Sequence, residues 1–149
     1  MTDKKWGHDV WIFLHTLVSK INKDVFNDHK KTIIEFIFKI CTNLPCPECS
    51  KHSSEFLKTV HFNNVTKKDD LIEILFVFHN QVNINTKKEE FPENLLHAYS
   101  EKNIMKVFNS FEKSFNMRTP PLLMSHAMMR KKTTSEIQKY LDINKENYI

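Results

Sequence analysis

Apolar side chains recur every three or four residues along most of this chain, the spacing that places them on one face of an α-helix. The first such stripe runs through residues 6–22 and consists of Val10, Phe13, Leu14, Leu17 and Ile21. The second runs through residues 29–43 and consists of Ile33, Phe36, Ile37 and Ile40. No stretch alternates apolar and polar residues over the length of a useful β-strand. The pattern therefore predicts an all-α fold.

Two further helices are expected after a break at residues 44–47, where two prolines end the second helix. The third should cover residues 47–60, because proline is favoured at the first helical position. Asp69 and Asp70 are good N-caps for a fourth helix that reaches about residue 85. Its apolar stripe consists of Leu71, Ile74, Leu75, Phe78 and Val82. Four helices joined by short links favour a bundle.

The C-terminal part of the chain carries a weaker helical pattern. A Pro-Glu pair favours a short fifth helix over residues 93–105. Residues 104–116 and 133–141 can form further helices, and the Thr-Pro-Pro run at 119–121 should end the first of these. This part is therefore expected to be either an additional helical element or a partly ordered arm.

Charge divides the chain at the same place. Residues 1–100 contain 13 Lys and Arg against 13 Asp and Glu, whereas residues 101–149 contain 9 against 5 and so carry the whole net charge of +4. Five of the six methionines also lie in this second segment. We therefore expect one domain over residues 1–105 and a basic, Met-rich C-terminal extension over residues 106–149.

Composition excludes several classes of protein. With 149 residues, 40% of them hydrophobic and 27% charged, the chain is long enough for one ordinary globular core. A single glycine, Gly7, argues against Rossmann and P-loop nucleotide sites, which need several. The N-terminus shows no signal or transit peptide, and no apolar run is long enough to cross a membrane. The expected location is cytoplasmic, where thiols are normally reduced and a CxxC is typical of redox or metal chemistry.

The CxxC motif is Cys46-Pro47-Glu48-Cys49. If Cys46 is an N-cap and Pro47 the first helical residue, Cys49 lies in the first turn, where free amides and the helix dipole favour a thiolate. Such a pair can exchange disulfides. The alternative is half of a zinc site, completed by His52 and perhaps Cys41. Outside that reading, Cys41 is expected to be a buried structural thiol.

Two other clusters are candidates for binding a flat ligand. Gly7, Trp11 and His15 share one helix stripe and combine a missing side chain, a flat ring and a hydrogen-bonding edge. The simpler interpretation of this cluster is a helix start with ordinary core packing. The second cluster consists of His79, Asn80, Val82 and Asn83, followed by Lys87 and Lys88. A planar heterocycle and a phosphate would satisfy these polar groups, although a solvated helix end explains them equally well.

Taken together, the three clusters resemble the Erv/ALR family of flavin-dependent sulfhydryl oxidases. The resemblance covers about residues 6–105 and is closest to the short versions found in large cytoplasmic DNA viruses. The matching positions are Gly7, Trp11, His15, Thr16, Cys46, Cys49, His52, His79, Asn80, Val82, Asn83, Lys88 and Phe91. The family's usual leucine and glycine before the lysine are replaced here by Thr86 and Lys87, and no second, shuttle CxxC is present.

The resemblance implies a four-helix bundle with a short fifth helix across it, usually as a homodimer, and noncovalently bound FAD. Trp11 and His15 would lie against the adenine–ribose side, Lys88 would approach the phosphates, and Cys49 would lie next to the isoalloxazine. The expected cofactor-binding residues are Gly7, Trp11, His15, Cys49, His52, His79, Asn80, Val82, Asn83, Lys87, Lys88 and Phe91. No metal site is expected on this reading.

The implied activity is a FAD-linked thiol oxidase with Cys46 and Cys49 as catalytic residues. Cys46 would exchange with protein thiols, and electrons would pass to FAD and then to O2 to form H2O2. The expected partner is a thioredoxin-like or small CxxC redox protein, in a viral cytoplasmic pathway of disulfide formation. No nucleic-acid or membrane partner is expected. One alternative is a zinc-binding helical interaction module using Cys46, Cys49 and His52, and another is a helical partner-binding protein with an incidental disulfide. Both leave the two ligand-like clusters without a purpose.

Overall fold

All regular structure in the described part of the chain is helical. The computed structural model describes residues 5–117 and 124–149. The α-helices are α1 (Lys5–Lys20), α2 (Phe26–Cys41), α3 (Pro47–Lys58), α4 (Lys68–Asn85), α5 (Ile104–Phe115) and α6 (Met124–Ile143). Short 3-10 helices are η1 (Phe62–Asn64), η2 (Glu93–Glu101) and η4 (Lys145–Tyr148). The predicted all-α class is confirmed. No helix of the described ranges is both long and apolar enough to span a membrane.

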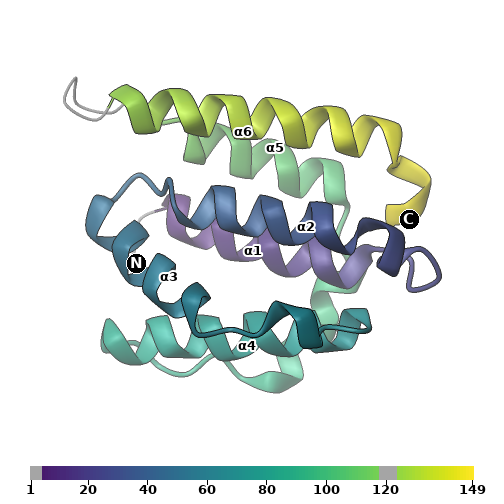
Figure 1. Cartoon of the computed structure of the whole chain (residues 1–149), viewed down its shortest axis with the longest axis horizontal. Helices are drawn as coiled ribbons and strands as arrows, with labels where there is room; N and C mark the ends of the chain where they lie inside the picture. Colours follow the sequence, from purple (N-terminus) through teal and green to yellow (C-terminus); the bar gives the residue numbers. More distant parts are fainter. Residues whose placement is uncertain (1–4, 118–123) are drawn as a thin grey trace.

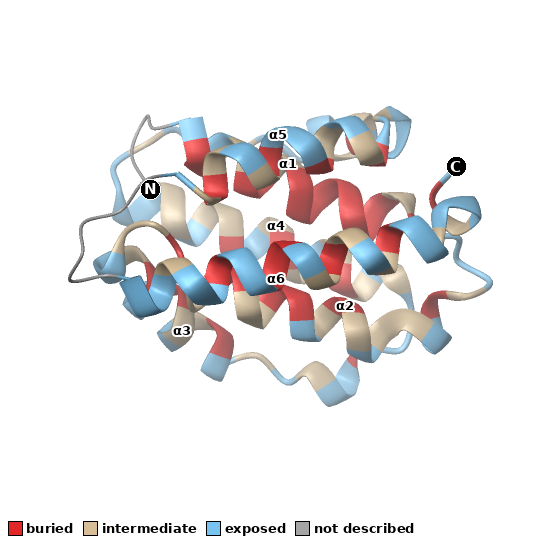
Figure 2. Ribbon diagram, turned by 90° about the horizontal axis from the view of Figure 1, so that it is seen from above, coloured by how far each residue is buried: buried red, intermediate tan, exposed pale blue. Residues whose placement is uncertain are grey.

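Helix α1 lies at the centre of the molecule and is buried along most of its length (Figure 2). It packs against α5, η2 and α4, and more lightly against α2 and η4. Apolar residues occupy more than one face of α1, and Val10, Leu14 and Val18 are completely buried. A helix that is apolar on several faces is stable only when neighbours cover them all. The central position of α1 follows from this pattern.

The C-terminal helices α5 and α6 complete the core. They lie side by side along one side of α1 and α2, opposite α3 and α4 (Figure 1). Phe13 of α1 stacks on Phe111 of α5 with ring centres 4.6 Å apart. Phe36 of α2 meets Tyr140 of α6 edge to face at 5.3 Å. Residues 104–115 and 124–143 are therefore ordered elements of the fold, and the domain boundary at residue 105 stays a prediction.

Three details of the predicted elements are wrong. Helix α4 begins at Lys68, with Lys67 as its N-cap, so Asp69 and Asp70 lie inside the first turn and are not the N-cap. Asp70 still stabilises this start, because its carboxylate accepts hydrogen bonds from the backbone of Thr66 and Lys67. The short fifth helix is a 3-10 helix that ends at Glu101.

The third difference between pattern and structure concerns α6, which is much longer than the predicted stretch at 133–141. Its first two turns contain exposed methionines, so the apolar period that marks a buried face is absent there. The first buried residues of α6 are polar: Arg130 in the second turn, followed by Thr133 and Thr134 in the third. The predicted stop at 119–121 lies outside the described residues.

Candidate active site

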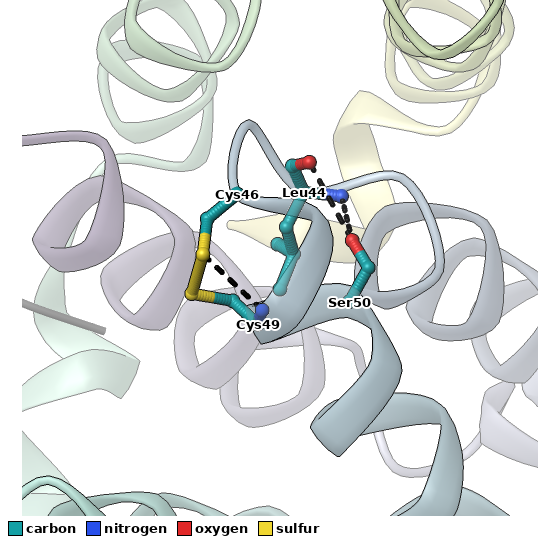
Figure 3. Close-up of a disulfide and its surroundings, with 4 residues drawn as sticks. All are labelled: Leu44, Cys46, Cys49 and Ser50. Atoms are coloured by element: carbon teal, nitrogen blue, oxygen red, sulfur yellow. Dashed lines mark hydrogen bonds between the residues drawn. A yellow bond between two sulfur atoms is a disulfide. The ribbon is translucent and has the colours of Figure 1, made fainter. Parts of the chain in front are cut away.

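The two cysteines of the CxxC motif form a disulfide at the N-terminus of α3 (Figure 3). Cys46 is the N-cap and Pro47 the first helical residue, as the sequence predicted. The Cα atoms of Cys46 and Cys49 lie 5.2 Å apart, and the Cys49 amide donates a hydrogen bond to Cys46 Sγ at 3.2 Å. A thiolate on Cys46 would accept the same amide, so the helix start favours the charged form of this sulfur.

The loop before the disulfide is fastened to α3. The Leu44 amide donates to Ser50 Oγ at 2.8 Å, and Ser50 Oγ donates back to the Leu44 carbonyl at 3.5 Å (Figure 3). Both residues are buried. The backbone that leads into Cys46 is therefore fixed relative to the helix that carries Cys49, which keeps the two sulfurs together when their bond opens.

A hollow of about 300 Å³ opens beside the disulfide. We call it the redox hollow, and its lining consists of Cys46, Glu48, Cys49, His52, Ser53, Val82, Asn85 and Thr86. Both cysteines are partly exposed, so a thiol from another molecule can reach the S–S bond. Of the predicted site residues, the structure brings Cys46, Cys49, His52 and Val82 together here.

A second hollow of about 350 Å³ lies on the α1 side of α4. We call it the aromatic hollow, and its lining consists of Gly7, His8, Trp11, Ile12, His79, Asn83, Lys88, Glu89, Phe91 and Tyr99. The indole of Trp11 and the imidazole of His79 are nearly parallel, with centres 4.2 Å apart. Phe91 stacks on His79 at 4.8 Å, and Tyr99 stacks on His15 at 4.7 Å. Flat rings therefore form much of its wall.

The two histidines of this hollow are coupled and electrically neutral at pH 7. His15 Nε2 and His79 Nδ1 lie 3.0 Å apart, so one ring donates a hydrogen bond to the other. Burial, with a smaller contribution from the neighbouring His79, lowers the pKa of His15 to about 3. Burial likewise lowers the pKa of His79 to about 4, with smaller contributions from His8 and Lys88. The pair therefore offers rings and hydrogen bonds without positive charge.

The amide side chains of α4 hold the segment that follows the helix. Asn80 Oδ1 accepts from the Phe91 amide at 2.6 Å, and Asn80 Nδ2 donates to the Phe91 carbonyl at 3.2 Å. Asn83 Nδ2 donates to the Glu89 carbonyl at 3.1 Å. These bonds place Phe91 against His79. The partners that the sequence required for the two asparagines are thus, in this structure, backbone groups of residues 89–91.

Lys87 is the described non-glycine residue with a left-handed backbone, at a φ of 60°. It follows the C-cap of α4, and the Lys88 amide donates to the Asn83 carbonyl at 2.8 Å while the Lys87 amide donates to Ile84. This is a Schellman motif, which usually has glycine at the left-handed position. Lys87 therefore occupies a left-handed position at which the resembled family has glycine. Lys88 lines the aromatic hollow, and Lys87 lines neither hollow.

The residues of the two hollows fit a dinucleotide with a planar ring at one end. The C-terminal half of α4 contributes to both, with Val82 and Asn85 in the redox hollow and His79 and Asn83 in the aromatic hollow. Gly7 lines the second hollow, where a Cβ would take up space. Aromatic faces suit a heterocycle, and the Lys88 ammonium suits a phosphate. The residues present therefore match the chemistry of FAD.

Tyr99 is the main site residue that the sequence did not single out. It is 8% exposed, stacks on His15 and lines the aromatic hollow. It lies in a 3-10 helix, eight residues after Phe91, and its neighbours show no motif. The only signal available was the general tendency of tyrosine to carry an apolar ring with a polar end.

The structure does not favour the zinc interpretation. The sulfurs of Cys46 and Cys49 are bonded to each other, whereas zinc requires thiolates. Among residues 5–117 and 124–149, no group of three or more His, Cys, Asp or Glu side chains is placed to hold a metal. Cys41 is a free, buried cysteine, and burial raises the pKa of its thiol to about 12, so it stays protonated.

Comparisons with known proteins give the same picture. The model of the Erv1 / Alr family matches residues 8–109. A probable FAD-linked sulfhydryl oxidase of fowlpox virus is 30% identical over 78 residues, which are 52% of this chain and 74% of the relative. A putative FAD-linked sulfhydryl oxidase of invertebrate iridescent virus 3 is 28% identical over 88 residues, which are 58% of this chain and 60% of the relative. The FAD-linked sulfhydryl oxidase ERV1 of Arabidopsis thaliana is 28% identical over 92 residues, covering 62% of this chain and 48% of that protein. No solved structure matches the chain.

Proposed function

The chain belongs to the Erv1 / Alr family, and on that premise we propose that it forms disulfides in protein thiols through the Cys46–Cys49 pair. It is a FAD-linked thiol oxidase. The observation that carries the proposal is the position of the disulfide at the start of α3. It lines the redox hollow, and the neighbouring aromatic hollow is walled by stacked rings. The two hollows share the C-terminal half of α4.

The proposed reaction begins at Cys46. A substrate thiolate attacks Cys46 Sγ, a substrate–Cys46 bond forms, and the S–S bond breaks with its electron pair on Cys49. A second substrate thiolate then attacks the substrate sulfur, which becomes a substrate disulfide and releases Cys46. The amide of Cys49, which donates to Cys46 Sγ in the disulfide form, stabilises the charge on the released sulfur. The substrate has lost two electrons, and the enzyme cysteines have gained them.

We propose that the aromatic hollow and the redox hollow hold the two ends of FAD. Trp11, His79 and Phe91 supply flat faces, and Gly7 leaves room for the ligand to approach α1. Bound FAD supplies a two-electron acceptor, with O2 as the final acceptor and H2O2 as the product. Because His15 and His79 are neutral, they bind an uncharged ring without the cost of desolvating a cation.

Within this proposal the remaining predicted residues have distinct tasks. Cys49 and His52 face the redox hollow and would lie nearest the reacting end of the cofactor. Lys88 lines the aromatic hollow and is better placed than Lys87 to meet a phosphate. Asn80 and Asn83 act indirectly, because their side chains hold Phe91 and Glu89 in place.

Partners and setting also belong to the proposal. A thioredoxin-like or small CxxC protein fits the exchange chemistry, and the relatives from fowlpox virus and an iridescent virus support a viral pathway of disulfide formation in the cytoplasm. Support for a homodimer comes from Val77 and Ile84, which lie two turns apart on α4 and are 48% and 56% exposed. Light scattering on the purified protein measures this directly.

The test of the proposed function is a visible absorption spectrum of the purified protein. We expect a flavin band that disappears when dithiothreitol is added without oxygen and returns when air is admitted, with release of H2O2. Cys46→Ser should keep the band and lose the response to dithiothreitol at low concentration. A colourless protein that binds no added FAD would overturn the proposal.

A further inference from the structure

Arg130, in the second turn of α6, is a buried arginine without a counter-ion among the described residues. Its side chain is 1% exposed. Nη1 donates to the Asn43 carbonyl at 3.3 Å, and the guanidinium lies 5.9 Å from the centre of the Phe115 ring. Nε and Nη2 have no hydrogen-bond partner within residues 5–117 and 124–149. A buried cation with unmet hydrogen bonds is unfavourable, and a negative charge formed nearby would relieve it.

The hydrogen bond from Arg130 ends on the loop that carries the disulfide. Asn43 follows the C-cap of α2 and precedes Cys46 by three residues. The next residue, Leu44, is the one held by Ser50 of α3. The loop is thus held at two successive residues, by α6 on one side and by α3 on the other. Arg130 supplies the contact from α6.

Arg130 contacts the backbone only three residues before Cys46. Three residues of extended chain span at most about 11 Å, so Cys46 cannot lie farther than that from Asn43 along the backbone. Arg130 is buried while Cys46 is partly exposed, so water and salt screen their interaction only in part, and a modest effect on the sulfur remains. Burial lowers the pKa of the Arg130 guanidinium from its ordinary value, which agrees with an uncompensated charge.

We propose that Arg130 is a positioning residue for the Cys46–Cys49 disulfide, which it holds through the Asn43 carbonyl and whose reduced form it stabilises by its charge. On reduction, the S–S bond takes an electron pair from a dithiol, whose own sulfurs join in a disulfide and release two protons. When one proton returns to the enzyme, one cysteine is a thiol and the other a thiolate. Arg130 favours that anion and therefore raises the reduction potential of the pair.

Arg130 lies outside the part of the chain that the family model matches. The family match ends at residue 109, before α6 begins. The 78 matched residues are 74% of the fowlpox protein, so that protein has about 105 residues and is shorter than the position of Arg130. The inference rests on the proposed function only in taking Cys46 and Cys49 as the redox pair.

The test measures the reduction potential of the disulfide in the full chain with FAD bound. The protein is equilibrated without oxygen in mixtures of reduced and oxidised dithiothreitol, and free thiols are counted by alkylation and mass spectrometry. Arg130→Met and Arg130→Gln remove the charge and should lower the equilibrium constant for reduction about tenfold, a fall of about 30 mV. Arg130→Lys keeps the charge and should stay within about twofold of the parent.

Lys39→Met is the matched control, because it breaks the 2.8 Å ion pair with Glu136 that also joins α2 to α6. It should leave the potential unchanged. The melting temperature of Arg130→Met should hold or rise, since an uncompensated charge is gone. An unchanged potential in the neutral variants, or an equal fall in Lys39→Met, would overturn the proposal. If Arg130→Met does not fold, the reduction potential of Arg130→Gln takes its place as the test.

The measurement requires no turnover. A shifted potential in a protein without oxidase activity would therefore contradict the proposed function and support Arg130. An unchanged potential in an active oxidase would contradict Arg130 alone.

Discussion

The redox hollow and the aromatic hollow share a wall, the C-terminal half of α4, but differ in nearly every physical respect. The redox hollow contains two partly exposed sulfurs at a helix N-terminus, where negative charge is favoured. The aromatic hollow contains a buried histidine pair that stays neutral and rings stacked at 4.2–4.8 Å. Chemistry that exchanges with other proteins needs exposure and charge, whereas binding of a flat ligand needs dry, rigid surfaces.

Because of this difference, mutations in the two hollows should have different effects, one on turnover and the other on cofactor binding. Changes in the redox hollow should remove turnover and keep the cofactor. Changes in the aromatic hollow should weaken cofactor binding first. A redox-hollow variant that loses the cofactor, or an aromatic-hollow variant that loses turnover while keeping it, would show that the two hollows act as one site.

The largest effect is expected at the cysteines. Cys46→Ser and Cys49→Ser each leave no disulfide to exchange, so oxidase activity should fall to background while FAD stays bound. Oxygen uptake with dithiothreitol measures the first and the flavin-to-protein ratio the second. Cys41→Ala is the matched control, since Cys41 is buried and protonated, and it should keep activity within about twofold. Loss of FAD in the serine variants would contradict the division.

The next largest effect is expected at His79. His79→Ala removes the ring that stacks on Trp11 and Phe91 and leaves His15 without its hydrogen-bond partner. Because His79 lines the aromatic hollow, its loss removes one aromatic face offered to FAD, and we expect FAD affinity to fall about tenfold, or by about 1.4 kcal/mol.

Fluorescence titration of the flavin measures this affinity. His79→Phe sharpens the result, because it keeps the stacked ring and loses only the polar contact. It should recover most of the affinity. Equal losses in both variants would mean that the polar ring atoms of His79, and not its flat face, are needed for FAD binding.

A moderate effect is expected from pH. The pKa of His15 is about 3 in the fold and ordinarily about 6.5 in an unfolded chain. Between these values the unfolded chain binds more protons, so stability is complete above about pH 6.5 and declines as the pH falls toward 3. The slope from His15, which is 2% exposed, approaches about 1.4 kcal/mol per pH unit. His79, with a pKa of about 4, acts in the same direction.

Melting temperatures of the parent and of His15→Gln, taken from about pH 7 to about pH 5 at constant ionic strength, isolate this contribution. The variant should lose less stability on acidification than the parent. Parallel curves would show that the histidine pair does not govern the acid response.

The smallest effect is expected at Lys87, between the segments that line the two hollows. Lys87→Gly relieves a left-handed backbone and should stabilise the fold by about 1 kcal/mol, or about 2–4 °C in melting temperature. FAD affinity should be unchanged, whereas Lys88→Ala should weaken it. A loss of affinity in Lys87→Gly would assign the phosphate contact to Lys87 instead.

Much of the first hundred residues could be predicted because local signals there agree with the fold. The apolar stripes of α1, α2 and α4 and the proline at the start of α3 correspond directly to observed helices. The disulfide's place at a helix start follows from Cys46 and Pro47 alone. Long periodic stretches carry most of the information that a single sequence holds about helices.

What could not be predicted depends on partners far along the chain. Tyr99 joins the site because η2 packs against α1, and nothing near Tyr99 in the sequence announces that contact. Asn80 suggested a ligand contact, yet its side chain is satisfied by the backbone of Phe91. The second turn of α6 is buried through Arg130, which contacts Phe115 and the Asn43 carbonyl, 87 residues away in the sequence. Such contacts have no local period to detect.

The position of α1 at the centre of the molecule has a consequence for how the protein is made. Asp9 of α1 and Ser114 of the covering helix α5 are hydrogen-bonded although they lie 105 residues apart in the sequence. Helix α1 therefore leaves the ribosome long before α5 is made. At a synthesis rate of about 5–20 residues per second, its apolar faces wait about 5–20 s for α5. The core of this helical protein thus depends on contacts between residues far apart in the sequence. We expect the nascent chain to need chaperones until α5 and α6 have emerged.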